Sequence, residues 1–326
     1  MATSGSYDYS VTAANIIQAA LEDIGAIDAG GTVSSSDSTL CLRRLNFIAK
    51  QFQGNSDKLP GLKVWTRQRI TLALAKGQQS YTIGPASTDS RASTQMGRTT
   101  LSAAEAAGQT TLSITSNTDT TSYPGTTITM TASDFIGIQL DDGTIQWTTI
   151  SGTPSTTADV AVALTGAAAS GNYVYWFTSR AQRFPIIEYA VLREADGTDT
   201  PLYIYREVIE YESLTDKQAD GDPTCVLVEP QRINTRVTFD SQPDDVEKRV
   251  VLTVMYPAED YDATTDDIAF PQEWFAALEW ELAFRVIPAF GLPWTQEMQA
   301  NYVRAMGIAS NLNEQNSSAY FQPGAE

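Results

Sequence analysis

Histidine is absent from the chain of 326 residues, and cysteine occurs only twice. Without histidine, the sequence has no Cys/His zinc site of the usual kind and no Ser-His or Cys-His pair for nucleophilic catalysis. Cys41 and Cys225 lie far apart and form no CxxC pair, so we expect both to be small buried hydrophobic residues. The phosphate-binding patterns GxxxxGK and GxGxxG and the hydrolase pattern GxSxG do not occur either.

Long apolar runs are also missing. No window of about 18 residues is continuously apolar and free of charge, so we expect no transmembrane helix. The first residues, MATSGSYDYS, have neither a basic run nor an apolar core, and we expect no secretory signal there. With 42% hydrophobic and 18% charged residues, the composition is typical of a globular protein of two or three domains.

Positive charge is scarce, since the net charge is −18, and it is concentrated in one segment. Between residues 43 and 76 the only acid is Asp57. The basic residues of this segment are Arg43, Arg44, Lys50, Lys58, Lys63, Arg67, Arg69 and Lys76. A chain this acidic is expected to bind duplex DNA poorly, because neutralising phosphates takes clustered cations. We expect the basic segment, chiefly Arg43, Arg44, Lys50, Lys63, Arg67 and Arg69, to be a solvated face or to meet an acidic partner, with a small DNA patch as the alternative.

Helical periodicity is found at both ends of the chain. We expect a helix after the cap Thr12, a second from about Asp37 to Gly54, a third from Pro271 to about Pro288, and a fourth after Thr295. Between these pairs the pattern is β-rich. The sequence therefore predicts an α+β protein with a helical-bundle core of two N-terminal and two C-terminal helices and a β-rich middle.

The β-rich middle contains a segment of different composition. Lysine and arginine are absent from residues 99–179, where threonine, serine, alanine and glycine dominate. Alternation around Asp142-Gly143 predicts a tight hairpin there, and alternation around Lys76-Gly77 predicts another upstream. We therefore expect an inserted β-sandwich or barrel-like domain over 98–179, a core of helices with a β-rich portion over 1–97 plus 180–312, and an extended tail over 313–326.

The stretch FPQEWFAALEWELAFRVIPAFGLPW, residues 270–294, is apolar on nearly every side of a helical wheel. Such a helix is buried on more than one face. We favour burial in a contact between subunits, with burial inside one subunit as the alternative. The candidate interface residues of the helix are Trp274, Phe275, Trp280 and Phe284.

Acidic clusters suggest chemistry only weakly. The spacing of Asp260, Asp262, Asp266 and Asp267 partly fits a calcium loop, but Thr265 and Pro271 stand where glycine and glutamate are required. Glu273, Glu279 and Glu281 could supply the two carboxylates of a glycosidase, yet no pocket motif accompanies them. We expect no catalytic residue, no metal and no cofactor.

Four blocks of the sequence resemble the head-to-tail adaptor proteins of tailed bacteriophages, most closely the tail accessory or connector proteins of short-tailed phages. The blocks are TAANIIQAALEDIGAIDAG, LRRLNFIAKQFQ, VWTRQRITLALAKGQQSYTIGP and FPQEWFAALEWELAFRVIPAFG. They cover about half of the chain, and none is a catalytic signature.

The resemblance implies a homo-oligomeric ring, expected to have twelve copies, located in the neck of the virion tail and assembled in the host cytoplasm. Its partners would be the portal protein above and the tail nozzle or tube below, and DNA would pass through its lumen without specific binding. The flexible C-terminus of the family docks on the portal, which corresponds here to residues 313–326 with Tyr320 and Phe321 as apolar anchors. The segment 98–179 has no counterpart in the common core and would lie outside the ring, where it could dock tail fibres.

Two functions of other classes remain open from the sequence. In the first, the β insertion recognises a host glycan through Trp147, Tyr173, Tyr175 and Trp176, because aromatic rings stack on sugars. Such residues at alternating strand positions are more often part of a core. In the second, the protein is a cell-wall hydrolase, a reading that rests on the acidic residues alone.

Overall fold

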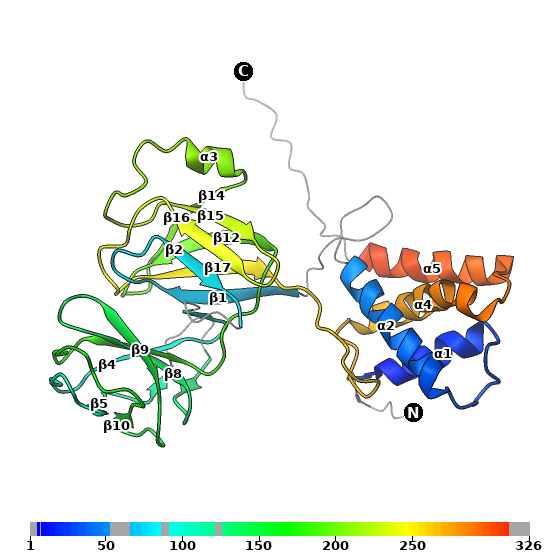
Figure 1. The fold of residues 1–326 in the computed structure, drawn as a ribbon, viewed down its shortest axis with the longest axis horizontal. Coiled ribbons are helices and arrows are strands. Elements are labelled where there is room, and N and C mark those ends of the chain that lie inside the picture. The colour runs from blue at the N-terminus through cyan, green and yellow to red at the C-terminus, as the bar shows by residue number, and fades with distance from the viewer. Residues whose placement is uncertain (1–4, 7, 53–65, 86–90, 121–125, 313–326) are drawn as a thin grey trace. The chain divides into compact units, whose positions relative to one another are not determined.

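The computed structural model of the chain describes residues 5–6, 8–52, 66–85, 91–120 and 126–312. It contains both helices and several sheets, which confirms the predicted α+β class. The chain divides into two compact units (Figure 1). The first consists of residues 1–66 and 257–326, and the second consists of residues 67–256.

The first unit is helical. Its elements are α1 (Ala13–Asp23), α2 (Ser35–Gln51), the 3-10 turn η2 (Gln272–Trp274), α4 (Phe275–Phe290) and α5 (Gln296–Leu312). Thr12 caps α1 as predicted, in a capping box with Asn15. The second helix starts two residues before Asp37, because Ser34 is its cap and accepts the Asp37 N–H at 3.2 Å. Gly291 ends α4 in the left-handed conformation, with φ of 65°.

One hydrophobic core joins the helices of this unit. It includes the apolar stripes of α1, α2 and α4 together with Phe52, Phe270 and Trp274. The rings of Phe52 and Trp274 pack edge to face with centroids 5.5 Å apart. The apolar side of α4 that carries Leu278 and Leu282 is therefore covered by its own unit.

The second unit is built around two sheets that share a core. The five-stranded sheet has the order β13 (Asp199–Pro201), β12 (Ile186–Arg193), β17 (Arg249–Met255), β1 (Arg67–Ala73) and β3 (Ala92–Ser93). The four-stranded sheet has the order β14 (Tyr203–Tyr205), β15 (Cys225–Pro230), β16 (Thr235–Phe239) and β2 (Ser80–Ile83), and the short helix α3 (Val208–Glu212) follows β14. This part of the chain is thus rich in strands, as expected for the β-rich middle.

The hairpin predicted around Lys76-Gly77 is wrong in its pairing. The chain does turn there, with φ of 72° at Gly77, but β1 pairs with β17 while β2 pairs with β16 in the other sheet. The reason is that Ile70 and Leu72 of β1 and Tyr81 and Ile83 of β2 approach the shared core from opposite sheets. Alternation alone predicts the strands but not their partners.

Residues 98–179 lie entirely within the second unit and have a core of their own. Their main sheet has the order β4 (Gly97–Thr100), β11 (Tyr173–Phe177), β8 (Phe135–Gln139) and β9 (Ile145–Thr149), and the smaller pairs are β5 (Thr111–Ser113) with β10 (Thr157–Asp159) and β6 (Thr118–Asp119) with β7 (Ile128–Thr129). The hairpin predicted at Asp142-Gly143 is confirmed between β8 and β9, with φ of 82° at Gly143. We call residues 98–179 the inserted segment.

The core expected over 1–97 plus 180–312 is divided between the two units. The boundary falls at residues 66 and 67 and again at 256 and 257, at the outer ends of the paired strands β1 and β17. Backbone pairing between these strands ties residues 67–97 to the second unit rather than to the helices. The tail expected over 313–326 lies outside the described residues.

Candidate functional site

An aromatic cluster lies on the surface where α4 and α5 meet. It consists of Trp280, Phe284, Trp294 and Tyr302, which we call the aromatic patch. The Phe284 ring centroid lies 5.2 Å from that of Trp294 and 5.8 Å from that of Tyr302, and Trp280 is 6.3 Å from Trp294. Phe284 is 47% exposed, whereas the other three side chains are half-buried. The patch is thus an aromatic surface held in place by its own ring contacts.

A buried carboxylate supports the aromatic patch from below. Glu281 is only 4% exposed, and it accepts hydrogen bonds from Arg285 Nε at 2.6 Å and from the Tyr302 hydroxyl at 2.8 Å. Arg285 also contacts the side chain of Gln51 on α2. Burial and the bond to Glu281 raise the pKa of Tyr302 to about 12, so its hydroxyl keeps its proton at neutral pH. These contacts fix α4 against α5 and α2.

The four interface candidates of the apolar helix separate into two groups. Trp274 is 2% exposed in the core of the helical unit, so it cannot form a contact surface, and the expectation for this residue is corrected. Phe275 is half-buried against the same core, with its ring centroid 6.3 Å from that of Tyr9. Trp280 and Phe284 belong to the aromatic patch. Tyr320 and Phe321 lie outside the described residues.

The basic segment crosses the boundary between the two units. Arg43, Arg44 and Lys50 belong to α2, whereas Arg67 and Arg69 belong to β1; Lys63 lies outside the described residues. Lys50 Nζ lies 2.6 Å from Asp260 and also 2.6 Å from the carbonyl oxygen of Ala258. Arg67 is paired with Glu188. Two members of the segment are therefore held by acids of their own unit.

Within the calcium-like loop, Asp266 binds the backbone of the loop itself. The carboxylate of Asp266 accepts the N–H groups of Asp262 and Ala263, each at 2.8 Å. This is how an Asp stabilises a turn. The arrangement gives no reason to assign a metal to these residues.

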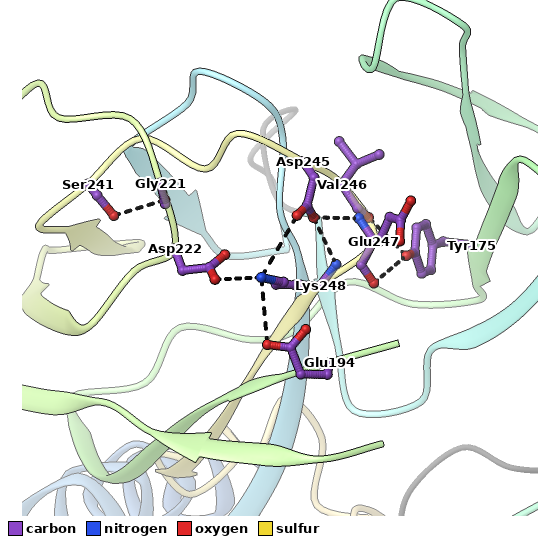
Figure 2. Close-up of polar contacts among 9 residues, drawn as sticks. All are labelled: Tyr175, Glu194, Gly221, Asp222, Ser241, Asp245, Val246, Glu247 and Lys248. Carbon is purple, nitrogen blue, oxygen red and sulfur yellow. Dashed lines mark hydrogen bonds and ion pairs between the residues drawn. The ribbon is translucent and has the colours of Figure 1, made fainter. Parts of the chain in front are cut away.

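A second acidic group was not anticipated from the sequence. Asp222, Asp244 and Asp245 are, within the described part of the chain, close enough to share a metal ion. The ammonium of Lys248 already lies among them: it bonds to Asp222 and lies 3.6 Å from Glu194 and 4.0 Å from Asp245 (Figure 2). The bond to Asp222 is the main cause that raises the pKa of Lys248. A protein cation therefore already lies within this cluster and compensates part of its negative charge.

The glycosidase candidates do not converge as a pair. Glu281 is bound by Arg285, and Glu273 is exposed at the start of the helix. Burial raises the pKa of Glu279 to about 8, and a hydrogen bond and the negative charge of Asp23 add to the shift. Glu279 therefore holds a proton at neutral pH, but its neighbour is the end of α1 rather than a second candidate carboxylate.

The aromatic residues proposed for glycan binding are mostly internal. Tyr175 and Trp176 are completely buried, and Trp147 and Tyr173 are half-buried. Gly97 allows this packing, since a Cβ atom there would lie 2.3 Å from the Trp176 ring. These four residues do not form an exposed platform on which a sugar could stack.

Three arginines that the sequence analysis did not select are brought together in the second unit. Arg98 begins the inserted segment, Arg193 ends β12 and Arg249 begins β17 opposite Arg193. They come from three distant parts of the chain. The only signal in the sequence is their position in alternating strands, which is equally typical of solvent-exposed residues.

Within the described residues, no helix is both long enough and apolar enough to span a bilayer. Comparison of the chain with protein-family models and with curated proteins finds no match.

Proposed function

We propose that the protein is a subunit of the head-to-tail adaptor ring of a tailed bacteriophage, which joins the portal vertex to the tail nozzle or tube and continues the DNA channel. The resemblance in four sequence blocks is the starting point of this proposal. The grouping of the first two and last two helices around one core is compatible with the predicted helical-bundle core of such a subunit.

The observation that carries the proposal is the aromatic patch. Trp280 and Phe284 lie in the block of residues 270–291, and Trp294 and Tyr302 follow it. The patch leaves Phe284 47% exposed, although Leu278 and Leu282 of the same helix are fully buried. An aromatic surface with little charge is typical of the centre of a protein interface. A subunit that meets its neighbour or the portal through this surface would cover Phe284 and the exposed parts of the other three rings, which also pack against the core of their own unit.

The net charge of the chain supports the proposal that the ring continues the DNA channel. With a net charge of −18, the lumen of such a ring would repel DNA rather than hold it, so that DNA could slide without tight phosphate contacts. In this proposal the residues 313–326 dock on the portal, and the inserted segment lies outside the ring as a surface for tail fibres.

Native mass spectrometry of the full chain, alone and mixed with its portal protein, tests the proposal directly. We expect a closed ring of many copies of 35.4 kDa with the portal present. Phe284→Ser should reduce ring formation while the chain remains folded, because the side chain is 47% exposed and its loss removes only the ring contacts to Trp294 and Tyr302. Val162→Ser is the matched control, since Val162 is 57% exposed and belongs to the inserted segment of the second unit rather than to the helical unit. A chain that stays monomeric beside the portal would refute the proposal.

A further inference from the structure

The five-stranded sheet has one face turned toward the shared core and one face turned away from it. Ile70 and Leu72 of β1 belong to the core, so Arg69 and Thr71 lie on the other face. Strand register places Arg69 and Tyr189 on either side of Thr253. Two residues away along β17, Val251 lies between Thr71 and Val191. Two residues further, Arg249 lies opposite Arg193. This outward face thus collects arginines from three adjacent strands.

A cavity of about 120 Å³ opens on this face. Its lining residues are Arg69, Tyr189, Val191, Arg193, Asp199, Val251 and Thr253. The volume is well above the roughly 10 to 15 Å³ that one water molecule needs, so a small polyatomic ion fits. The walls carry two guanidinium groups and two hydroxyl groups, while the valines form an apolar floor.

The acid in the cavity wall is already neutralised. Asp199 accepts two hydrogen bonds from Arg193, at 2.6 and 2.7 Å. The bonds from Arg193 are the main cause that lowers the pKa of Asp199, and the positive charges of Arg69 and Arg249 lower it further. Asp199 is therefore paired within the cavity wall, and the positive charges of Arg69 and Arg249 also act on it.

Arg249 lies opposite Arg193 in the strand register and is a buried cation without a counter-ion among the described residues. It is 8% exposed, its Nε has no hydrogen-bond partner, and none of the described residues forms an ion pair with it. Burial lowers its pKa, the positive charges of Arg98 and Arg193 lower it further, and Asp119 opposes them from beyond ion-pair distance. Nη1 of Arg98 is also buried and unpartnered. An uncompensated buried charge is strongly unfavourable unless an anion balances it.

We propose that this cavity binds a small oxyanion, a phosphate or carboxylate group, contacted by Arg69 and Arg193 and balanced electrostatically by the buried charge of Arg249. Planar guanidinium groups match the geometry of such oxygens, and hydroxyls of Thr253 and Tyr189 can donate as well. The site would lie near the place where the five-stranded sheet meets the beginning of the inserted segment. There Arg98 donates through Nη2 to the carbonyl oxygen of Ala195 at 2.7 Å, just beyond the end of β12. It does not depend on ring formation.

Calorimetric titration of the full chain with inorganic phosphate, and separately with acetate, tests the proposal at constant ionic strength set with sodium chloride. We expect saturable binding of at least one of the two anions, with the dissociation constant rising about tenfold in Arg69→Gln through loss of a charged hydrogen bond. Binding of phosphate alone would assign a phosphate site, and binding of both would assign a general oxyanion site. Arg236→Gln is the matched control, since that arginine lies in the other sheet and bonds to Ser80.

Thermal unfolding of Arg249→Met in chloride and in phosphate distinguishes an anion-balancing role of Arg249 from a purely structural one. In chloride the variant should be as stable as the natural chain or more stable, because it removes an unbalanced buried charge. In saturating phosphate the natural chain should gain stability by mass action and the variant should gain much less. No binding of either anion, or equal binding by the natural chain and Arg69→Gln, would overturn the proposal.

Discussion

The hydroxyl of Tyr175, in the middle of β11, lies 2.9 Å from the backbone carbonyl oxygen of Val246, to which it donates a hydrogen bond. Tyr175 belongs to the inserted segment, and Val246 precedes β17 of the five-stranded sheet. Both residues are buried in a small apolar cluster with Ala73, Met96 and Phe177. Side-chain packing and the hydroxyl of Tyr175, which also lies 3.2 Å from the carbonyl oxygen of Glu247, thus attach the inserted segment to the segment that leads into β17.

Tyr175→Phe should destabilise the second unit by about 1 to 3 kcal/mol, because the carbonyl oxygen of Val246 would remain buried without its donor. Urea unfolding followed by near-ultraviolet circular dichroism measures the change. Tyr173→Phe is the control. Tyr173 is half-buried, and loss of its hydroxyl group should change the free energy of unfolding by less than about 0.5 kcal/mol. Equal effects of the two substitutions would show that the hydrogen bond to Val246 contributes nothing.

The helical unit should lose stability as the pH rises. The pKa of Glu279 is about 8 in the folded chain, against 4.5 when unperturbed, so its contribution is complete below about pH 4.5 and is lost as the pH rises through 8. Glu279→Gln mimics the protonated form and should be more stable than the natural chain at pH 9, by about 1 to 2 kcal/mol after allowance for solvent screening.

Melting temperatures at pH 5, 7 and 9, followed by the helical circular dichroism signal, check this prediction. The profile of Glu279→Gln should be flatter than that of the natural chain across this interval. Glu273→Gln serves as the control because Glu273 is exposed. Parallel profiles for Glu279→Gln and the natural chain would contradict the assignment.

Arg285→Met should destabilise the helical unit by about 2 to 4 kcal/mol, because it leaves the buried carboxylate of Glu281 without its cation. The double variant Glu281→Leu with Arg285→Met should be less destabilised than the sum of the two single variants, since the unpaired charge is then absent. Chemical denaturation of the four proteins gives this coupling. Strict additivity would mean that the two side chains act independently despite their 2.6 Å contact.

Lys248→Met should destabilise the second unit by about 1 to 3 kcal/mol, because Asp222, Asp245 and Glu194 would face one another without the ammonium. Differential scanning calorimetry measures the loss. Lys50→Met is the comparison, since Lys50 and Asp260 are an exposed pair, and its effect should stay below about 1 kcal/mol. The prediction fails if Lys50→Met is as damaging as Lys248→Met.

Local patterns were sufficient for the elements themselves. The cap at Thr12 and the 3.6-residue periodicity after it predicted α1, and Asp142-Gly143 predicted the hairpin of β8 and β9. These features depend on residues a few positions apart, whose backbone preferences and hydrogen bonds are set locally. The sequence of helices, strands and helices, and with it the α+β class, follows from the same information.

Partners distant in the sequence were decided by the tertiary structure. The strand β1 pairs with β17 and not with β2, Trp274 lies in a core while Phe284 lies on a surface, and the basic segment is divided between two units. The same holds for Arg193 and Arg249, which become neighbours only through the pairing of β12 with β17. Composition and periodicity by themselves determined which residues form helices and strands; which of those residues meet depends on how the apolar faces are buried together, and that is a property of the whole chain.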